Sequence, residues 1–186
     1  MEKVIIPALF VIFLIAAITP RIIQKQKKIE TVGCIGIDKR IFMLGKISLF
    51  TSFILILVQL FFVNLSLFET KEIFFWACVA LLGLGVVFFT LAIMGLGTFS
   101  LRVGLAQEKT ALRTTGIYRV SRNPMLFGLY LMALASAIYV QYPINWILVI
   151  IALTVHHKII LAEELSMRDR FGEQWTAYCN SVRRYL

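Results

Sequence analysis

Charged residues are missing from long parts of this sequence, and that absence decides the class of protein. Residues 4–19, 47–68, 73–101 and 123–157 contain no Asp, Glu, Lys or Arg. Hydrophobic residues make up 60% of the chain, well above the roughly 45–50% of a soluble globular domain. These uncharged stretches exclude a soluble domain and predict an integral membrane protein.

Cysteine and histidine are scarce, with 3 Cys and 2 His in 186 residues. Cys34, Cys78 and Cys179 are far apart and form no Cys-x-x-Cys pair, which argues against a disulfide framework and against a zinc site. His156 and His157 are adjacent, so on a helix they point about 100° apart. We therefore expect no metal site and interpret both histidines as polar groups that face an aqueous or headgroup layer.

Acidic residues are also few, with 10 Asp and Glu against 19 Lys and Arg, for a formal net charge of +9. The basic residues gather between the apolar stretches: six against two acidic residues in 21–40, and five against one in 102–122. This is the pattern of cytoplasmic loops in membrane proteins. No basic helix face carries interleaved aromatics, so we expect no nucleic acid partner.

The uncharged stretches predict five membrane helices. The first three stretches each suit one crossing, and Pro20 is predicted to end the first helix. Residues 123–157 are too long for one crossing and are interrupted by Gln141, Pro143 and Asn145, so they predict a helical hairpin.

The chain is thus expected to be an all-α integral membrane protein with a cytoplasmic helical tail after the hairpin. We divide it into residues 1–101, with three membrane helices and their loops, and residues 102–186, with a cytoplasmic loop, the hairpin and the tail. Five crossings and the basic loops put the N-terminus outside and the C-terminus in the cytoplasm. The membrane would be the cell membrane, or the endoplasmic reticulum in a eukaryote.

The stretch from residue 112 to residue 128 joins a basic loop directly to the fourth predicted helix. Asn123-Pro124 predicts a turn followed by a helix start, because proline at the first helical position loses no needed donor. The free N–H groups of a helix N-terminus attract anions, and Arg122 precedes this turn. The pattern predicts a site for a negatively charged group at the water boundary.

Four motifs follow one another in the C-terminal half. They are Gly116-Ile117-Tyr118, Arg122-Asn123-Pro124-Met125-Leu126-Phe127-Gly128, Glu163-Glu164, and a Phe171-Gly172 pair followed by Trp175 and Tyr178. In order and spacing they resemble the membrane methyltransferase superfamily that includes isoprenylcysteine carboxyl methyltransferases and phospholipid N-methyltransferases. Asn123, Leu126 and Trp175 depart from the His, Tyr and Tyr of the family pattern. Phospholipid N-methyltransferases also show the Asn variant.

The resemblance implies S-adenosylmethionine as methyl donor, bound at the cytoplasmic mouth. The residues implied for the cofactor are Gly95, Gly97, Gly116, Tyr118, Arg122, Asn123, Pro124, Gly128, Glu163 and Glu164. The catalytic residues implied are Glu163, Glu164 and Arg184, and Trp175 and Tyr178 are expected to dock the tail by packing.

The glycines of the third predicted helix have two readings. Gly83 and Gly85 are interpreted as points of close helix packing in lipid. Gly95 and Gly97 lie where phospholipid N-methyltransferases carry a Gly-x-Gly that contributes to cofactor binding. For this pair, cofactor binding and packing both stay open.

Glu163 and Glu164 end the fifth predicted membrane helix, where a carboxylate is opposed by the helix dipole. By themselves they would be explained by an i,i+4 pair of Glu164 with Arg168 and by a solvated Glu163. The resemblance instead gives one of them to the ammonium group of the cofactor.

The acceptor is expected to be a lipid-like or prenylated molecule in the membrane. A carboxylate acceptor, as in isoprenylcysteine carboxyl methyltransferases, would be positioned by Arg184 and needs no base. The alternative, a phospholipid ethanolamine, must lose a proton, for which Glu163 or Glu164 would serve. Asn123 and Leu126 are three residues apart on one helix face and are assigned to the acceptor channel. A sterol-reductase-like enzyme with a nicotinamide cofactor and a non-enzymatic membrane scaffold also stay open.

Overall fold

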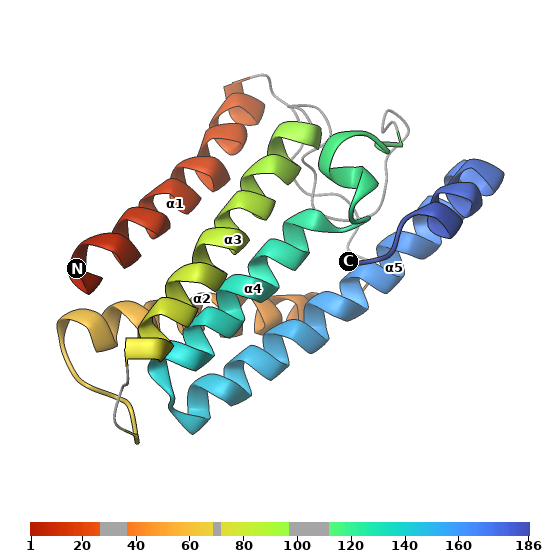
Figure 1. Ribbon diagram of the computed structural model, residues 1–186. Coiled ribbons are helices and arrows are strands. Elements are labelled where there is room, and N and C mark those ends of the chain that lie inside the picture. The colour runs from red at the N-terminus through yellow and green to blue at the C-terminus, as the bar shows by residue number, and fades with distance from the viewer. Residues whose placement is uncertain (27–36, 69–71, 97–111) are drawn as a thin grey trace.

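Helices make up the regular structure of this protein. The computed structural model describes residues 1–26, 37–68, 72–96 and 112–186, and no strand occurs in these ranges. The elements are α1 (Glu2–Gln26), α2 (Lys39–Phe61), α3 (Glu72–Leu96), the 3₁₀ helix η1 (Gly116–Arg119), α4 (Pro124–Val140) and α5 (Pro143–Ser181) (Figure 1). The predicted all-α class is confirmed.

The lengths and composition of these helices suit a bilayer. Among the described residues, α1, α2, α3 and α5 are long and apolar enough to cross a membrane, and α4 is a shorter apolar helix of 17 residues. At 1.5 Å per residue α4 is about 26 Å long, close to the thickness of a hydrocarbon core. The chain is an integral membrane protein, as the sequence predicts.

The helical hairpin predicted for residues 123–157 is also confirmed. It consists of α4 and the first part of α5, joined at Gln141 and Tyr142. Gln141 has a left-handed backbone with φ 49° and ends α4, and Pro143 opens α5 at a position where its missing N–H costs nothing.

Helix boundaries differ from those predicted by charge. The expected stop at Pro20 is wrong, because α1 continues to Gln26. Proline removes one backbone hydrogen bond from that turn, but the Thr19 hydroxyl donates to the Ile15 carbonyl at 2.7 Å and adds one beside it. The second helix was expected over 47–68. It spans Lys39 to Phe61 instead. The helix begins early because the Asp38 side chain accepts the Arg40 N–H at 2.7 Å and caps its N-terminus.

The hairpin packs most closely against α3, through glycines on both helices. A Cβ atom on Gly128 would lie 2.6 Å from the Gly85 carbonyl oxygen and 2.9 Å from the Phe89 nitrogen. A Cβ on Gly85 would lie 2.5 Å from the Met132 side chain. The two backbones therefore touch, and the packing role predicted for Gly85 is confirmed. Gly83 has nothing within 4 Å of such a Cβ, so the same role is wrong for Gly83.

A buried polar cluster ties the hairpin to α2. The Asn145 amide donates to the Ser136 hydroxyl at 2.8 Å, and the Ser136 hydroxyl donates to the Ser52 carbonyl at 2.7 Å. All three residues are fully buried. Because lipid offers no alternative partners, such interhelical hydrogen bonds fix which helix faces meet.

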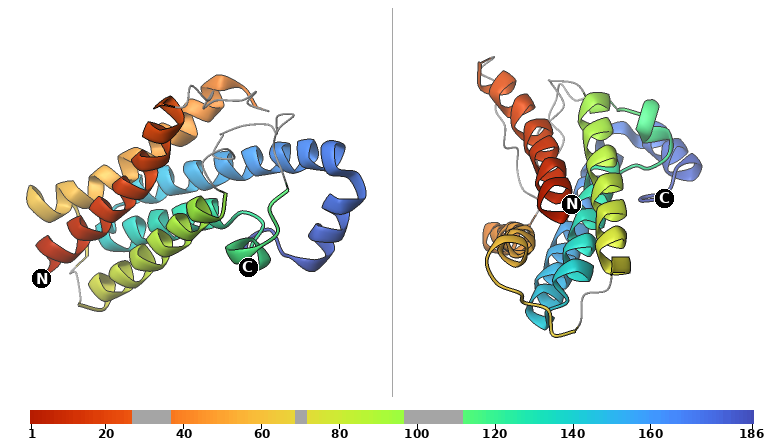
Figure 2. Two further views of the ribbon diagram at one scale, coloured as in Figure 1. Left: turned by 90° about the horizontal axis from the view of Figure 1, so that it is seen from above. Right: turned by 60° about the vertical axis from the view of Figure 1, so that its left-hand side comes forward.

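A sharp bend divides α5 at Gly172, where the backbone has φ 51° and ψ −118°. Only glycine adopts this conformation readily. Beyond the bend, the end of α5 turns back toward η1 and the start of α4 (Figure 2). The predicted helical tail is thus a continuation of α5, and it returns to the end of the hairpin at which α4 begins.

Gly128→Ala should lower the thermal stability of the protein in detergent. The added methyl group would push α3 and α4 apart, at a cost of about 1–3 kcal/mol. Gly83→Ala is the matched control, because its methyl group meets open space on α3 and alanine favours helix. Equal unfolding temperatures for Gly128→Ala and the wild type would contradict this account of the α3–α4 contact.

Candidate functional site

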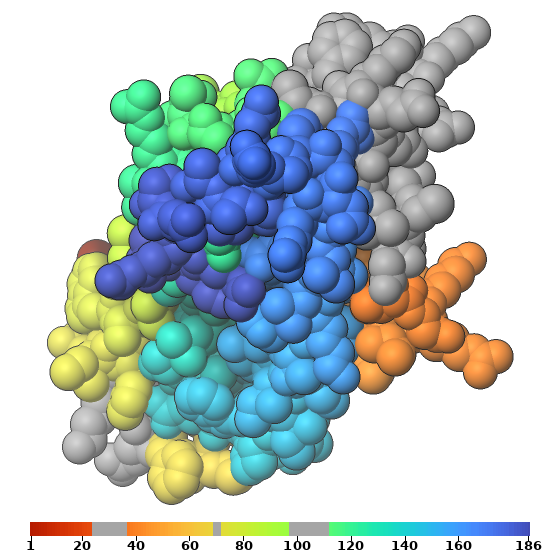
Figure 3. Space-filling model, turned by 90° about the vertical axis from the view of Figure 1, so that its right-hand side faces the viewer, coloured from red at the N-terminus to blue at the C-terminus, as the bar shows by residue number. Residues whose placement is uncertain are grey.

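The C-terminal tail lies against the loop that precedes α4. The Arg122 N–H donates to the Arg183 carbonyl at 3.0 Å, and the Asn123 N–H donates to the Arg184 carbonyl at 3.2 Å. From the side, the end of α5 and the tail cover one face of the molecule next to η1 (Figure 3). The tail and the basic loop, far apart in sequence, therefore form one unit.

Side chains of the loop strengthen this junction. The Ser121 hydroxyl and the Asn123 amide both donate to the Arg184 carbonyl, at 3.2 and 3.3 Å. Asn123 precedes Pro124, which is the first residue of α4, so the predicted turn and helix start are confirmed. The Asn123 side chain does not cap α4 and instead holds the tail.

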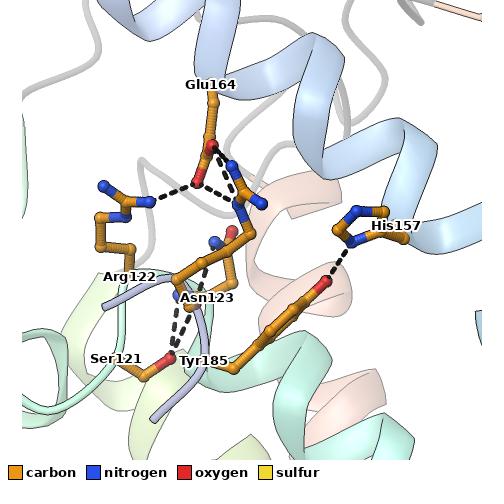
Figure 4. A network of polar contacts seen from close by, with 7 residues as sticks. Ser121, Arg122, Asn123, His157, Glu164 and Tyr185 are labelled. Atoms are coloured by element: carbon orange, nitrogen blue, oxygen red, sulfur yellow. Dashed lines mark hydrogen bonds and ion pairs between the residues drawn. The ribbon is translucent and has the colours of Figure 1, made fainter. Parts of the chain in front are cut away.

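Glu164 lies at the centre of the site, between two arginines (Figure 4). Arg184 donates to both carboxylate oxygens through Nε, at 3.0 and 3.1 Å, and through Nη2 at 2.8 Å. Arg122 Nη2 lies 3.2 Å from Oε1 of the same carboxylate. These partners lie far away in sequence, so the explanation of Glu164 by an i,i+4 pair with Arg168 is wrong.

Burial makes these ion pairs stronger than surface pairs. The side chains of Glu164 and Arg122 are only 14% and 10% exposed, and that of Arg184 is 35% exposed. Charges shielded in this way interact more strongly than solvated ones. Hydrogen bonding to Glu164 is the main reason why the pKa of Arg184 is raised above its usual value.

Aromatic residues of the bent end of α5 dock it onto η1. The Tyr178 hydroxyl donates to the Tyr118 carbonyl at 2.6 Å, and the Tyr118 hydroxyl donates to the Ala92 carbonyl of α3 at 3.3 Å. The Trp175 ring centroid lies 5.7 Å from the Arg122 guanidinium, within range of a cation–π contact. Burial raises the pKa of Tyr118 and so keeps its hydroxyl a donor. The packing role predicted for Trp175 and Tyr178 is confirmed.

The predicted glycines lie in different surroundings. A Cβ on Gly95 would lie 3.2 Å from the Tyr118 ring, so Gly95 gives η1 room to pack on α3. Gly116 has φ 63° and opens η1. Gly128 lies in the α3–α4 contact and not beside Glu164. Gly97, and the proposed division of the chain after residue 101, lie outside the described residues.

The structure thus brings together Arg122, Asn123, Glu164 and Arg184, with Pro124 directly behind Asn123. Glu163 is half-buried next to Glu164. Leu126 is half-buried one turn further along α4. Tyr118 is linked to this group indirectly. Its carbonyl accepts the Tyr178 hydroxyl, the Tyr178 ring packs on Trp175, and Trp175 contacts Arg122.

The interpretation of the histidine pair as groups that face an aqueous or headgroup layer is wrong for His156. His156 is buried, 8% exposed, and its Nδ1 lies 2.7 Å from the Ala152 carbonyl, so it does not face a headgroup layer. His157, rotated by about 100°, is half-buried with its Nδ1 2.6 Å from the Tyr185 hydroxyl. The seven-residue spacing of His157 and Glu164, which puts both on one helix face, was the signal that could have found it.

The ends of a helical hairpin and a returning tail thus enclose a shielded Glu–Arg cluster at one end of an all-helical membrane fold. The sequence model of one family, described as phospholipid methyltransferase, matches residues 73–174, more than half of the 186-residue chain. The chain belongs to the phospholipid methyltransferase family. A search of curated proteins gave no significant match.

The family match confirms the superfamily that the motifs indicate. It runs from α3 into the bent end of α5 and includes Arg122, Asn123 and Glu164. Arg184 and the tail lie beyond it. Members of this family are methyltransferases, which argues against the nicotinamide-dependent reductase and the non-enzymatic scaffold.

Gly172→Ala should loosen the tail from the site. Alanine at φ 51° is strained by about 1–3 kcal/mol, although no atom would lie within 4 Å of its Cβ. We expect faster hydrogen exchange across residues 173–186 in mass spectrometry. Glu173→Ala, at an exposed neighbour on a helical backbone, is the control and should exchange as the wild type does. Unchanged exchange in Gly172→Ala would show that the bend does not depend on glycine.

Proposed function

We propose that this protein transfers a methyl group from S-adenosylmethionine to the amine of a membrane lipid. The observation that carries the proposal is the shielded Glu164 between Arg122 and Arg184 at the N-terminus of α4. Family membership supports methyl transfer and a lipid-type acceptor. The methyl donor and the amine are our inference.

The residues of the site fit the polar groups of this cofactor. The amino acid end of S-adenosylmethionine carries an ammonium and a carboxylate, and the ammonium can take the place of Arg122 at Glu164 Oε1, where the contact of 3.2 Å is the longest that this carboxylate makes with the two arginines. Arg122 Nε is buried and has no hydrogen-bond partner within the described part of the chain, so it can donate to the carboxylate. The free N–H groups at the start of α4 add a second set of donors. Bound there, S-adenosylmethionine supplies an electrophilic methyl group on a sulfonium.

The chain's own residues would contribute mainly alignment and exclusion of water. Arg122 and Glu164 hold the two charged ends in a shielded setting, where electrostatic interactions are strong. Trp175 and Tyr178 close the side of the site formed by the bent end of α5. Displacement at a sulfonium needs positioning more than chemical assistance, so this arrangement suits the reaction.

An amine acceptor is favoured over the carboxylate acceptor by the position of Arg184. Its guanidinium already binds both oxygens of Glu164, whereas a carboxylate acceptor would need it for positioning. The family match points in the same direction. The acceptor would reach the site from the membrane beside Leu126 and Asn123, which share one face at the start of α4.

We also propose that the site faces the cytoplasm and that the N-terminus lies outside. The ends of α1 and α3 that lead into the basic segments lie on the same side of the bundle as the start of α4 (Figure 1). In the sequence, residues 21–40 and 102–122 hold 11 of the 19 Lys and Arg residues, a pattern typical of cytoplasmic loops.

Glu164→Gln and Arg122→Ala should each weaken the binding of S-adenosylmethionine in detergent, measured by calorimetry. Losing one charge-assisted hydrogen bond corresponds to about 10- to 100-fold in affinity. The exposed Arg168→Ala is the control for a lost surface charge on α5. Unchanged affinity in both site variants would refute the cofactor assignment.

The pH profile of methyl transfer should separate the two acceptor classes. An amine must lose a proton before it attacks, so the rate should climb steeply between about pH 6 and 9 with phosphatidylethanolamine. A carboxylate is ionised throughout that range and would give a flat profile. A flat profile, together with transfer to a prenylated cysteine and none to phosphatidylethanolamine, would favour the carboxylate reading.

A further inference from the structure

His157 lies on the same face of α5 as Glu164, deeper toward the apolar part of the helix. Seven residues correspond to two turns and about 10 Å along the axis. A lipid acceptor that enters from the membrane would meet this level before the level of Glu164. Both side chains border the returning tail (Figure 4).

The tail holds the imidazole of His157 in place. His157 Nδ1 lies 2.6 Å from the Tyr185 hydroxyl, and the two rings are 6.1 Å apart. The Tyr185 ring packs on Tyr130 of α4 at 5.5 Å, and the Tyr130 hydroxyl donates to the Leu153 carbonyl at 3.3 Å. Elements α4, α5 and the tail therefore converge on one ordered histidine.

Tyr185 directly follows Arg184, which binds Glu164. One short segment of tail thus links the proposed cofactor end of the site to the histidine. Tyr185 and Tyr130 are the titratable groups in this cluster within the described part of the chain. The hydrogen-bond partner of the imidazole in this cluster is the neutral Tyr185 hydroxyl.

Of the two expected bases, Glu163 and Glu164, Glu164 is poorly placed to accept a proton. Both of its carboxylate oxygens already accept hydrogen bonds or ion-pair contacts from Arg184 and Arg122. An imidazole is the side chain best suited to proton transfer near neutral pH. Nδ1 can donate its proton to the Tyr185 oxygen, which leaves Nε2 as the acceptor.

We propose that His157 is the proton acceptor for an amine-bearing lipid, with Tyr185 as the positioning residue that orients its ring. This inference rests on the proposed function. The ammonium of the acceptor gives one proton to Nε2 of His157. The freed nitrogen lone pair forms the new N–C bond to the methyl group as the C–S bond breaks, and the sulfur keeps that electron pair. The methylated nitrogen carries the positive charge lost by the sulfonium, and the imidazolium releases its proton to water.

The first test compares His157→Gln with the wild type in methyl transfer to phosphatidylethanolamine across pH. The variant should lose about 100-fold in rate at pH 7, and the loss should shrink as rising pH deprotonates the amine itself. The affinity for S-adenosylmethionine should stay within about twofold, which also reports on folding. Lys158→Gln, at the exposed neighbour, should behave as the wild type does. Tyr185→Phe should lose about tenfold in rate with the same shape of profile.

The second test needs no cofactor and no turnover. In ¹³C-histidine NMR, the signal assigned to His157 by its loss in His157→Gln should shift when phosphatidylethanolamine is added. Phosphatidylcholine, whose quaternary nitrogen has no proton to give, should leave it in place. Equal shifts with both lipids, or none with either, would overturn the assignment.

The outcomes separate this inference from the proposed function. A wild type that methylates no lipid amine overturns the proposed function, and the inference with it. An active wild type matched by His157→Gln in rate and profile overturns the inference alone. A loss that is constant across pH and accompanied by weaker cofactor binding assigns His157 a structural role and also overturns it.

Discussion

The site depends on the ion pairs that the shielded Glu164 carboxylate forms with Arg122 and Arg184. A largely buried charge must be compensated, and here the partners come from two distant segments, Arg122 before α4 and Arg184 in the tail. Because α5 continues past Glu164 to the bend at Gly172, Glu164 does not end a helix as the sequence predicts, and the two arginines rather than a helix terminus set its surroundings. The ion pairs therefore hold loop, helix and tail together as well as presenting charge to a ligand.

Two backbone features make that meeting possible. The bend at Gly172 turns the end of α5 back, so that Tyr178 and Trp175 reach η1 and Arg122. The direct contact of Gly85 with Gly128 fixes where α4 begins relative to α3. Neither feature supplies a chemical group, yet both determine where the charged groups lie.

The two parts of α5 differ in chemical character because the helix runs from the membrane into its aqueous boundary. Its first part is apolar and buries Asn145 against α2 and α4, while its later part carries His157 and Glu164 on one face. A water-soluble methyl donor and a membrane-bound acceptor would approach such a helix from different ends. The proposed roles of Glu164 and His157 match these two directions of approach, and family membership supports the lipid class of the acceptor.

The amino-acid sequence by itself determined the membrane class, the hairpin and the family, because uncharged stretches, Asn123-Pro124 and the spaced motifs are local signals. It also identified Arg122, Glu164 and Arg184, but not that they bind one another. Charge marked the helix ends poorly, because α1 continues through Pro20 to Gln26 and α2 already begins at Lys39, where the Asp38 side chain caps it. Only the tertiary structure decided the partners of Glu164, the packing role of Gly128 and the contact of His157 with Tyr185. The packing of Gly128 depends on how α3 and α4 meet. The partners of Glu164 and His157 depend on the reversal at Gly172, which brings the tail back to the loop before α4.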